Sequence, residues 1–258
     1  ISAFNNGGFS LYTDSMMGFS KDMFFIAPVM LAVIVGGLGF PVLIELHERL
    51  WRLRLKPGGK PKRFSLHTRL TLWMTVSLIG LGALFIGLLE WNNPGTLGGL
   101  NTWDKVVNTL FSAVMPRSGG FNSIDISLMD PATWLGIDLL MFIGGGSAST
   151  AGGIKVTTIA VLIFIVYTEI RGETAVNVGN RRLPRSIQRQ ALTLVALSTT
   201  AILGTTLLFA ATTDFSLDEI LFDVVSAAAT VGLSTGITAE LPAFHQFWLA
   251  LLMFVGRL

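Results

Sequence analysis

The chain has 258 residues and a net charge of +2, with 51% apolar and only 13% charged residues. A typical soluble domain carries about 25% charged residues, and so this deficit, spread over several long apolar runs, predicts an all-α protein that crosses a membrane several times. The absence of cysteine excludes disulfides and thiolate metal sites, and the three histidines lack the spacing of a zinc site.

Apolar runs alternate with short helical stretches and turn-rich segments along the chain. The expected membrane spans are residues 24–46, 70–89, 134–167 and 191–211, with shorter helices at 103–114 and 216–229. Start signals for the two short helices are Thr102 and a capping box from Ser216 to Glu219. A last apolar run begins near Phe244 and continues to Leu258. We therefore expect a fragment that is cut within its last membrane helix.

Basic residues are concentrated in two segments. Of the 18 Lys and Arg residues, eight lie in 49–69 and five in 171–189, whereas 212–243 has none. By the positive-inside rule, loops 47–69 and 171–189 are expected to be cytoplasmic in a multi-pass plasma-membrane protein. Because topology explains this charge, no nucleic-acid partner is expected.

Three glycine-containing stretches recur at a fixed interval. They read NNGGFS (5–10), RSGGFN (117–122) and ATVGLS (229–234), and Gly8, Gly120 and Gly232 are each 112 residues apart. A fixed period indicates a repeated unit, here a membrane helix, a half-helix, an irregular loop and a second membrane helix. The alternative is that such glycines only break helices or permit close packing, the interpretation that we prefer for Gly36, Gly37 and Gly39.

Irregular backbone at membrane depth must be buried in protein or line a wet cavity, and so the three stretches are expected to be re-entrant pore loops. The carbonyl end of a half-helix favours a cation, and loop carbonyl oxygens can replace the water around a dehydrated ion. Thr230-Val231-Gly232 matches the start of the potassium-channel filter sequence TVGYG. No ring of acidic residues lines the loops, which favours a monovalent cation. The predicted ion-binding residues are Asn6, Gly7, Gly8, Ser118, Gly119, Gly120, Thr230, Val231 and Gly232.

The sequence GGGSASTAGG at 144–153 interrupts an otherwise apolar span. Each glycine costs about 1 kcal/mol relative to alanine in a helix, and so we expect a non-helical, flexible plug that acts as a gate. The predicted gate residues are Gly144, Gly145, Gly146, Ser147, Ala148, Ser149, Thr150, Ala151, Gly152, Gly153, Lys155 and Arg257. A simple kink, a snorkelling Lys155 and an interfacial Arg257 are the alternatives. A nucleotide-binding P-loop is not expected, because Ile154 separates Gly153 from Lys155.

The stretches SAFNNGGFS, RSGGFNSID, GGGSASTAGGIKVTT and ATVGLSTGIT resemble the Ktr/Trk/HKT superfamily of potassium transporters, and most closely its KtrB-type membrane subunits. The resemblance implies helix–pore loop–helix repeats around a pseudo-fourfold pore, in a chain that lacks the first repeat. The end of repeat 2 would occupy 1–46, repeat 3 would occupy 70–170, and repeat 4 would occupy 190–258, truncated in its last helix. One departure is Met115-Pro116 before the second glycine stretch, where threonines are expected.

The resemblance also implies filter glycines at Gly8, Gly120 and Gly232, a pore-facing Arg257 and the 144–153 segment as the gate. It implies a homodimer with a cytosolic nucleotide-binding RCK ring, so that a nucleotide would bind only to that regulatory partner. No covalent cofactor is expected, and K⁺ is the expected transported ion.

The sequence therefore predicts potassium uptake through a backbone-carbonyl filter. The alternative is a secondary ion-coupled transporter with a broken-helix site at the membrane midplane. An enzyme is not expected, because a membrane enzyme needs paired acids or histidines within its spans, whereas Glu90 and Asp138 are isolated and lie near predicted span ends.

Overall fold

The computed structural model describes residues 1–55, 64–172, 176–178 and 181–257. The helices in this part are η1 (Met17–Phe19), α1 (Met23–Leu38), α2 (Phe40–Leu55), α3 (Leu66–Glu90), α4 (Thr102–Val114), α5 (Pro131–Phe142), α6 (Val156–Ile170), α7 (Arg185–Thr212), α8 (Leu217–Ala228), η2 (Ile237–Ala239) and α9 (Ala243–Arg257). Two short strands, β1 (Asn177–Val178) and β2 (Arg181–Arg182), pair antiparallel between α6 and α7. The expected all-α class is confirmed.

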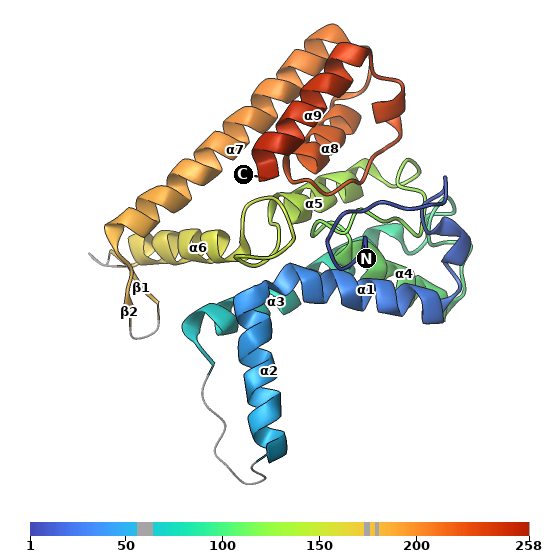
Figure 1. Ribbon diagram of the computed structural model, residues 1–258. Coiled ribbons are helices and arrows are strands. Elements are labelled where there is room, and N and C mark those ends of the chain that lie inside the picture. Colours follow the sequence, from blue (N-terminus) through green and yellow to red (C-terminus); the bar gives the residue numbers. More distant parts are fainter. Residues whose placement is uncertain (56–63, 173–175, 179–180, 258) are drawn as a thin grey trace.

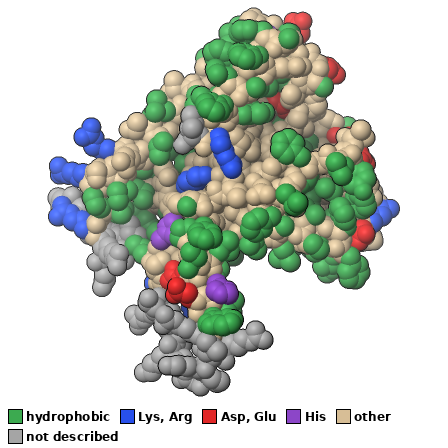
Figure 2. Space-filling model, viewed as in Figure 1, with side chains coloured by type: hydrophobic (Ala, Val, Ile, Leu, Met, Phe, Trp, Pro, Cys, Tyr) green, Lys and Arg blue, Asp and Glu red, His purple; other side chains and the backbone are tan. Residues whose placement is uncertain are grey.

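Two of the described helices, α3 and α7, are long and apolar enough to cross a membrane unaided. Their 25 and 28 residues correspond to about 37 and 42 Å at 1.5 Å per residue. Large apolar side chains such as Leu81 and Leu197, each 64% exposed, project from them. Figure 2 shows apolar side chains spread over the visible face. Such a surface fits contact with lipid rather than with water.

The expected span over 24–46 is divided into two helices. Helices α1 and α2 meet at 105°, and Gly39 between them has a φ of +92°. A Cβ at Gly39 would overlap the carbonyl oxygen of Ser147, so only glycine permits this bend and this contact. A Cβ at Gly36 would likewise overlap the carbonyl oxygen of Phe4, which confirms a packing role for this glycine. Helix α2 also continues to Leu55, into the segment that was expected to be a loop.

The short helices α4 and α8 lie inside the assembly of longer helices. Helix α4 packs on α1 and α3, and α8 is enclosed by α5, α7 and α9 (Figure 1). Ile220, Phe222 and Val224 of α8 have no exposed surface. Helix α8 is largely buried from Ile220 to its end, and so this part of the helix presents the residues that follow it rather than a face to lipid.

Capping residues fix where these short helices begin. The predicted capping box at Ser216 is confirmed, with Glu219 as its partner. The predicted cap at Thr102 is wrong, because the side chain of Asn101 accepts the hydrogen bond from the backbone N–H of Asp104 at 2.8 Å. Asn is a stronger N-cap than Thr, and the cap lies one residue earlier than expected.

The predicted interruption of the 134–167 span is confirmed. Helix α5 ends at Phe142 and α6 begins at Val156. Between them, Ile143 and Ile154 form an isolated parallel bridge that closes the base of the 144–153 loop. In Figure 1 this loop lies between the group formed by α7, α8 and α9 and the helices of the N-terminal half.

Candidate functional site

The three glycine loops, 5–10, 117–122 and 229–234, share one backbone conformation. In each loop two residues with positive φ are separated by one residue. The φ values are 52° and 68° at Asn6 and Gly8, 67° and 70° at Ser118 and Gly120, and 50° and 96° at Thr230 and Gly232. A non-glycine residue in this region costs about 1–2 kcal/mol, so its surroundings must hold it there. The 112-residue repeat of the sequence is thus also a repeat of backbone geometry.

The three glycines lie around a common point. A Cβ built on Gly8 would lie 3.0 Å from the Cα of Gly120 and 3.2 Å from the carbonyl oxygen of Val231. A Cβ on Gly120 would overlap that same oxygen, and one on Gly232 would lie 3.6 Å from the Cα of Gly120. The loops therefore pack backbone against backbone, with peptide oxygens facing the equivalent glycines.

Helices α4 and α8 end directly before two of these loops. Met115, which follows α4, accepts hydrogen bonds through its carbonyl oxygen from the N–H groups of Gly119 (2.8 Å) and Gly120 (3.4 Å). The chain thus turns tightly at the end of the helix, although Met115 stands where a threonine was expected. The partial negative charge of a helix C-terminus accordingly lies next to the loop.

Ser118 connects two glycine loops to the 144–153 loop. Its side chain is fully buried, and its Oγ accepts a hydrogen bond from the N–H of Gly152 at 2.9 Å. The same hydroxyl lies 3.2 Å from the carbonyl oxygens of both Ala229 and Thr230, to which it donates. A single side chain therefore couples three segments that are more than 30 residues apart in sequence.

The 144–153 loop lies directly against the glycine loops. A Cβ on Gly152 would overlap the Oγ1 of Thr230. Thr150 donates its hydroxyl to the carbonyl oxygens of Phe4 (3.2 Å) and Gly36 (3.1 Å), at the base of the first glycine loop. Because its glycines allow this approach from both sides, the loop closes one side of the point where the glycine loops meet.

Two basic side chains hold the 144–153 loop. The Nζ of Lys155 donates to the carbonyl oxygen of Ala151 at 2.5 Å, and a guanidinium N–H of Arg257 donates to that of Thr150 at 2.5 Å. Figure 2 shows basic side chains near the middle of the visible face, where α9 ends. Lys155 thus contacts the loop from the residue directly before α6, and Arg257 contacts it from the end of α9.

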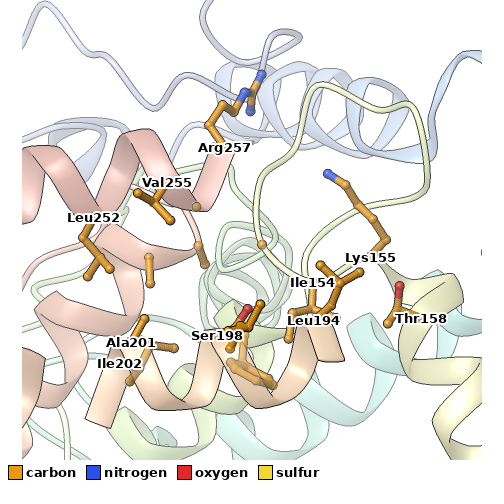
Figure 3. Close-up of a pocket in the computed structure, with 16 residues that line it drawn as sticks. Ile154, Lys155, Thr158, Leu194, Ser198, Ala201, Ile202, Leu252, Val255 and Arg257 are labelled. Carbon is orange, nitrogen blue, oxygen red and sulfur yellow. The ribbon is translucent and has the colours of Figure 1, made fainter. Parts of the chain in front are cut away.

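A cavity of about 440 Å³ opens beside the loop (Figure 3). Its wall is largely apolar, formed by residues of α7 and α9 such as Ala201 and Leu252, and Lys155 and Arg257 also line it. Gly153 and Ile154 also border this cavity, which therefore adjoins the end of the 144–153 loop.

The hydrogen-bond networks of two buried carboxylates were not predicted from the sequence. Glu90, expected to be isolated, is fully buried and accepts four hydrogen bonds, from Asn93, Thr96, Thr133 and the backbone of Asp130. Asp223 of α8 was not singled out at all, although it accepts hydrogen bonds from residues that follow Gly232. Among the described residues, no group of three His, Asp or Glu side chains could hold a metal ion.

Comparison with known proteins shows what the chain is similar to. The sequence matches the TrkH family, described as cation transport protein, over residues 1–258. It is 38% identical to Ktr system potassium uptake protein B of Bacillus subtilis and 36% identical to that of Vibrio alginolyticus, covering 100% of this chain in both cases. The chain spans 56% and 55% of the lengths of these two relatives. The crystal structure of the potassium transporter TrkH from Vibrio parahaemolyticus shares the fold, with a TM-score of 0.79 at 18% identity over 99% of this chain and 54% of that one.

Proposed function

Because the chain belongs to the TrkH family of cation transport proteins, we propose that it carries out potassium uptake through a filter made of backbone carbonyl groups. The observation that carries the proposal is the convergence of Gly8, Gly120 and Gly232 on a common point, each in the same conformation. The three glycine loops supply the ion-binding residues, and the 144–153 loop is the gate.

The chemistry of the loops fits a monovalent cation. A dehydrated K⁺ needs several oxygen ligands of modest field strength, which peptide carbonyls provide. Divalent cations prefer carboxylate oxygens. The predicted ion-binding positions contain no acidic residue, whereas the buried carboxylates Glu90 and Asp223 are occupied by hydrogen bonds from their own surroundings.

The contacts of the 144–153 loop support its role as the gate. Ser118 and Thr150 hydrogen-bond it to the glycine loops, and Arg257 holds it from α9. In this arrangement the loop blocks one side of the filter, and passage of an ion requires it to move. The adjoining cavity, lined by apolar side chains of α7 and α9, gives it space to do so.

The proposed function also implies an arrangement in the membrane and a set of partner proteins. Residues 1–46, 70–170 and 190–258 contribute to successive pore repeats in a plasma-membrane subunit, with the basic segments 47–69 and 171–189 on the cytoplasmic side. The relatives named Ktr system protein B support a multicomponent system. We place a second copy of the membrane subunit and a cytosolic nucleotide-binding RCK ring as the partners, with any nucleotide bound by the ring.

Rubidium uptake by the full-length protein, in cells that lack potassium uptake, tests the proposal. Gly232→Ser should reduce the preference for K⁺ over Na⁺, because the φ of +96° is unfavourable for serine. Deletion of 145–152 should raise the uptake rate. Gly204→Ser is the matched control, since no atom lies within 4 Å of a Cβ at this helical glycine. Wild-type selectivity in Gly232→Ser and a wild-type rate in the deletion would refute the filter and the gate.

The same assay separates this function from that of an ion-coupled secondary transporter. Uptake through a filter follows the membrane potential and the K⁺ gradient alone. An uptake rate that falls to background when the sodium and proton gradients are removed, while the potential is maintained, would favour the coupled transporter.

A further inference from the structure

The carboxylate of Asp223 holds the segment that leaves the third glycine loop. Its side chain, only 4% exposed, accepts hydrogen bonds from Ser234 Oγ (2.8 Å), from the backbone N–H of Thr235 (3.0 Å) and from Thr235 Oγ1 (3.2 Å). The hydroxyl of Thr238 also donates to it. All of these donors lie within six residues after Gly232, and so a single side chain fixes the path of the chain as it leaves the loop.

A second contact on the same face of α8 holds the glycine itself. Ser226 lies three residues after Asp223, which places both side chains on one side of the helix. Its Oγ accepts from the N–H of Gly232 at 3.2 Å, and its carbonyl oxygen accepts from the N–H of Val231 at 2.8 Å. One face of α8 therefore anchors the third glycine loop both at Val231–Gly232 and at 234–238.

The second glycine loop lacks this arrangement. The residue 112 positions before Asp223 is Phe111, which is fully buried in a hydrophobic cluster. There Asn122 is held by the segment that follows the first loop, since Asn122 N–H donates to Ser15 Oγ (3.2 Å) and Met16 N–H donates to Asn122 O (2.9 Å). Asp223 is thus a specific feature of the third loop.

We propose that Asp223 is a positioning residue for cation discrimination: it holds 234–238 and thereby fixes where the carbonyl groups of Val231 and Gly232 stand. The inference rests on the proposed function, because it concerns the same filter. K⁺ and Na⁺ differ little in radius, and a site must hold its ligands within about 0.5 Å to discriminate between such similar ligands. A segment freed from four hydrogen bonds with Asp223 no longer meets that requirement.

Glu90 provides the matched control for a purely structural role. It is also buried and also accepts four hydrogen bonds, but its donors, Asn93, Thr96, Asp130 and Thr133, lie outside the glycine loops. Both sites lose a comparable set of hydrogen bonds on substitution with alanine. Only Asp223 should alter how the protein ranks K⁺ and Na⁺.

The experiment measures KM for rubidium uptake and its inhibition by Na⁺, using the full-length protein in cells that lack potassium uptake. Asp223→Ala, which removes the acceptor of four hydrogen bonds, should reduce the K⁺/Na⁺ preference by about tenfold. Asp223→Asn, which keeps one acceptor oxygen, should recover part of it. Glu90→Ala should lower the amount of protein in the membrane and the maximal rate, but leave the K⁺/Na⁺ preference unchanged.

Thr238→Val keeps the inference falsifiable if Asp223→Ala does not reach the membrane, because it removes one donor and preserves side-chain shape. It should reduce the K⁺/Na⁺ preference about threefold, and its effect should not multiply with that of Asp223→Asn. A wild-type preference in Asp223→Ala or Thr238→Val, or an equal change in Glu90→Ala, would overturn the inference. If Gly232→Ser changes the preference while these variants do not, the filter stands and only the role of Asp223 fails. If wild-type protein does not take up rubidium, the proposed function itself fails.

Discussion

Replacement of Ser118 by alanine tests whether the filter and the gate are held together by one hydroxyl group. In the structure Ser118 Oγ accepts from the N–H of Gly152 and donates to the carbonyl oxygens of Ala229 and Thr230. Alanine removes all of these interactions but adds no bulk, and both residues are similarly disfavoured at the φ of +67°. The change therefore acts on the contact between the loops rather than on backbone strain.

The expected magnitude follows from the burial of this site. Ser118 has no exposed surface, so the N–H of Gly152 is left without an acceptor in Ser118→Ala, at a cost of about 1–3 kcal/mol. A displaced 144–153 loop exposes this N–H to water in the cavity and avoids the cost. The equilibrium between closed and open arrangements should therefore shift towards open by about 5- to 150-fold.

The initial rate of rubidium uptake, divided by the amount of protein in the membrane, measures this shift. Ser118→Ala should raise the rate under conditions in which wild-type uptake is low. Ser123→Ala is the control, because Ser123 is 2% exposed and its hydroxyl has no partner in the described part of the chain. Equal rates in the two variants would refute the proposed connection between the filter and the gate.

Three further predictions concern single substitutions at other positions. Gly152→Ala should also raise uptake, because its Cβ would overlap Thr230 Oγ1, whereas Gly80→Ala, with nothing within 4 Å, should leave the rate unchanged. Ala148→Gly should lower uptake, because alanine at a φ of +56° costs about 1–2 kcal/mol and glycine does not, so that glycine stabilises the observed closed arrangement of the loop. A rate at or above that of wild type would contradict this. Glu90→Gln should lower the thermal unfolding temperature of purified protein through a loss of about 1–3 kcal/mol, because the NH₂ group of glutamine would replace one acceptor oxygen and face the donors that bond to it. An unchanged unfolding temperature would show that the network is not stabilising.

The repeated loops could be predicted because their backbone conformation requires particular residues. A chain that must adopt positive φ at Gly8, Gly120 and Gly232 favours glycine there, and so the geometry leaves a visible period of 112 residues. The broken 134–167 span was predictable for a related reason, since several glycines and small polar residues within ten positions disfavour a helix.

The bend at Gly39 and the hydrogen-bond networks could not be predicted in the same way. Residues 24–46 are apolar except for Glu45, and an apolar run does not distinguish one straight span from two helices at 105°. The donors to Glu90 come from residues 93 to 133 and meet only in the folded chain. Likewise, nothing in the sequence distinguishes Asp223 from other acidic residues on short helices, because its donors at 234–238 contact it only in the folded chain.

Under the proposed function, the contacts of Ser118 couple ion binding to gating. If the 144–153 loop moves, Ser118 loses its contact with Gly152, and the hydroxyl that also bonds to Ala229 and Thr230 changes its environment. Coupling between two sites is reciprocal, so an ion that stabilises one arrangement of these carbonyl groups must also bias the loop. Under this proposal the carbonyl groups that bind the ion and the 144–153 loop are coupled, and substitutions in this loop should change the KM for the cation as well as the rate.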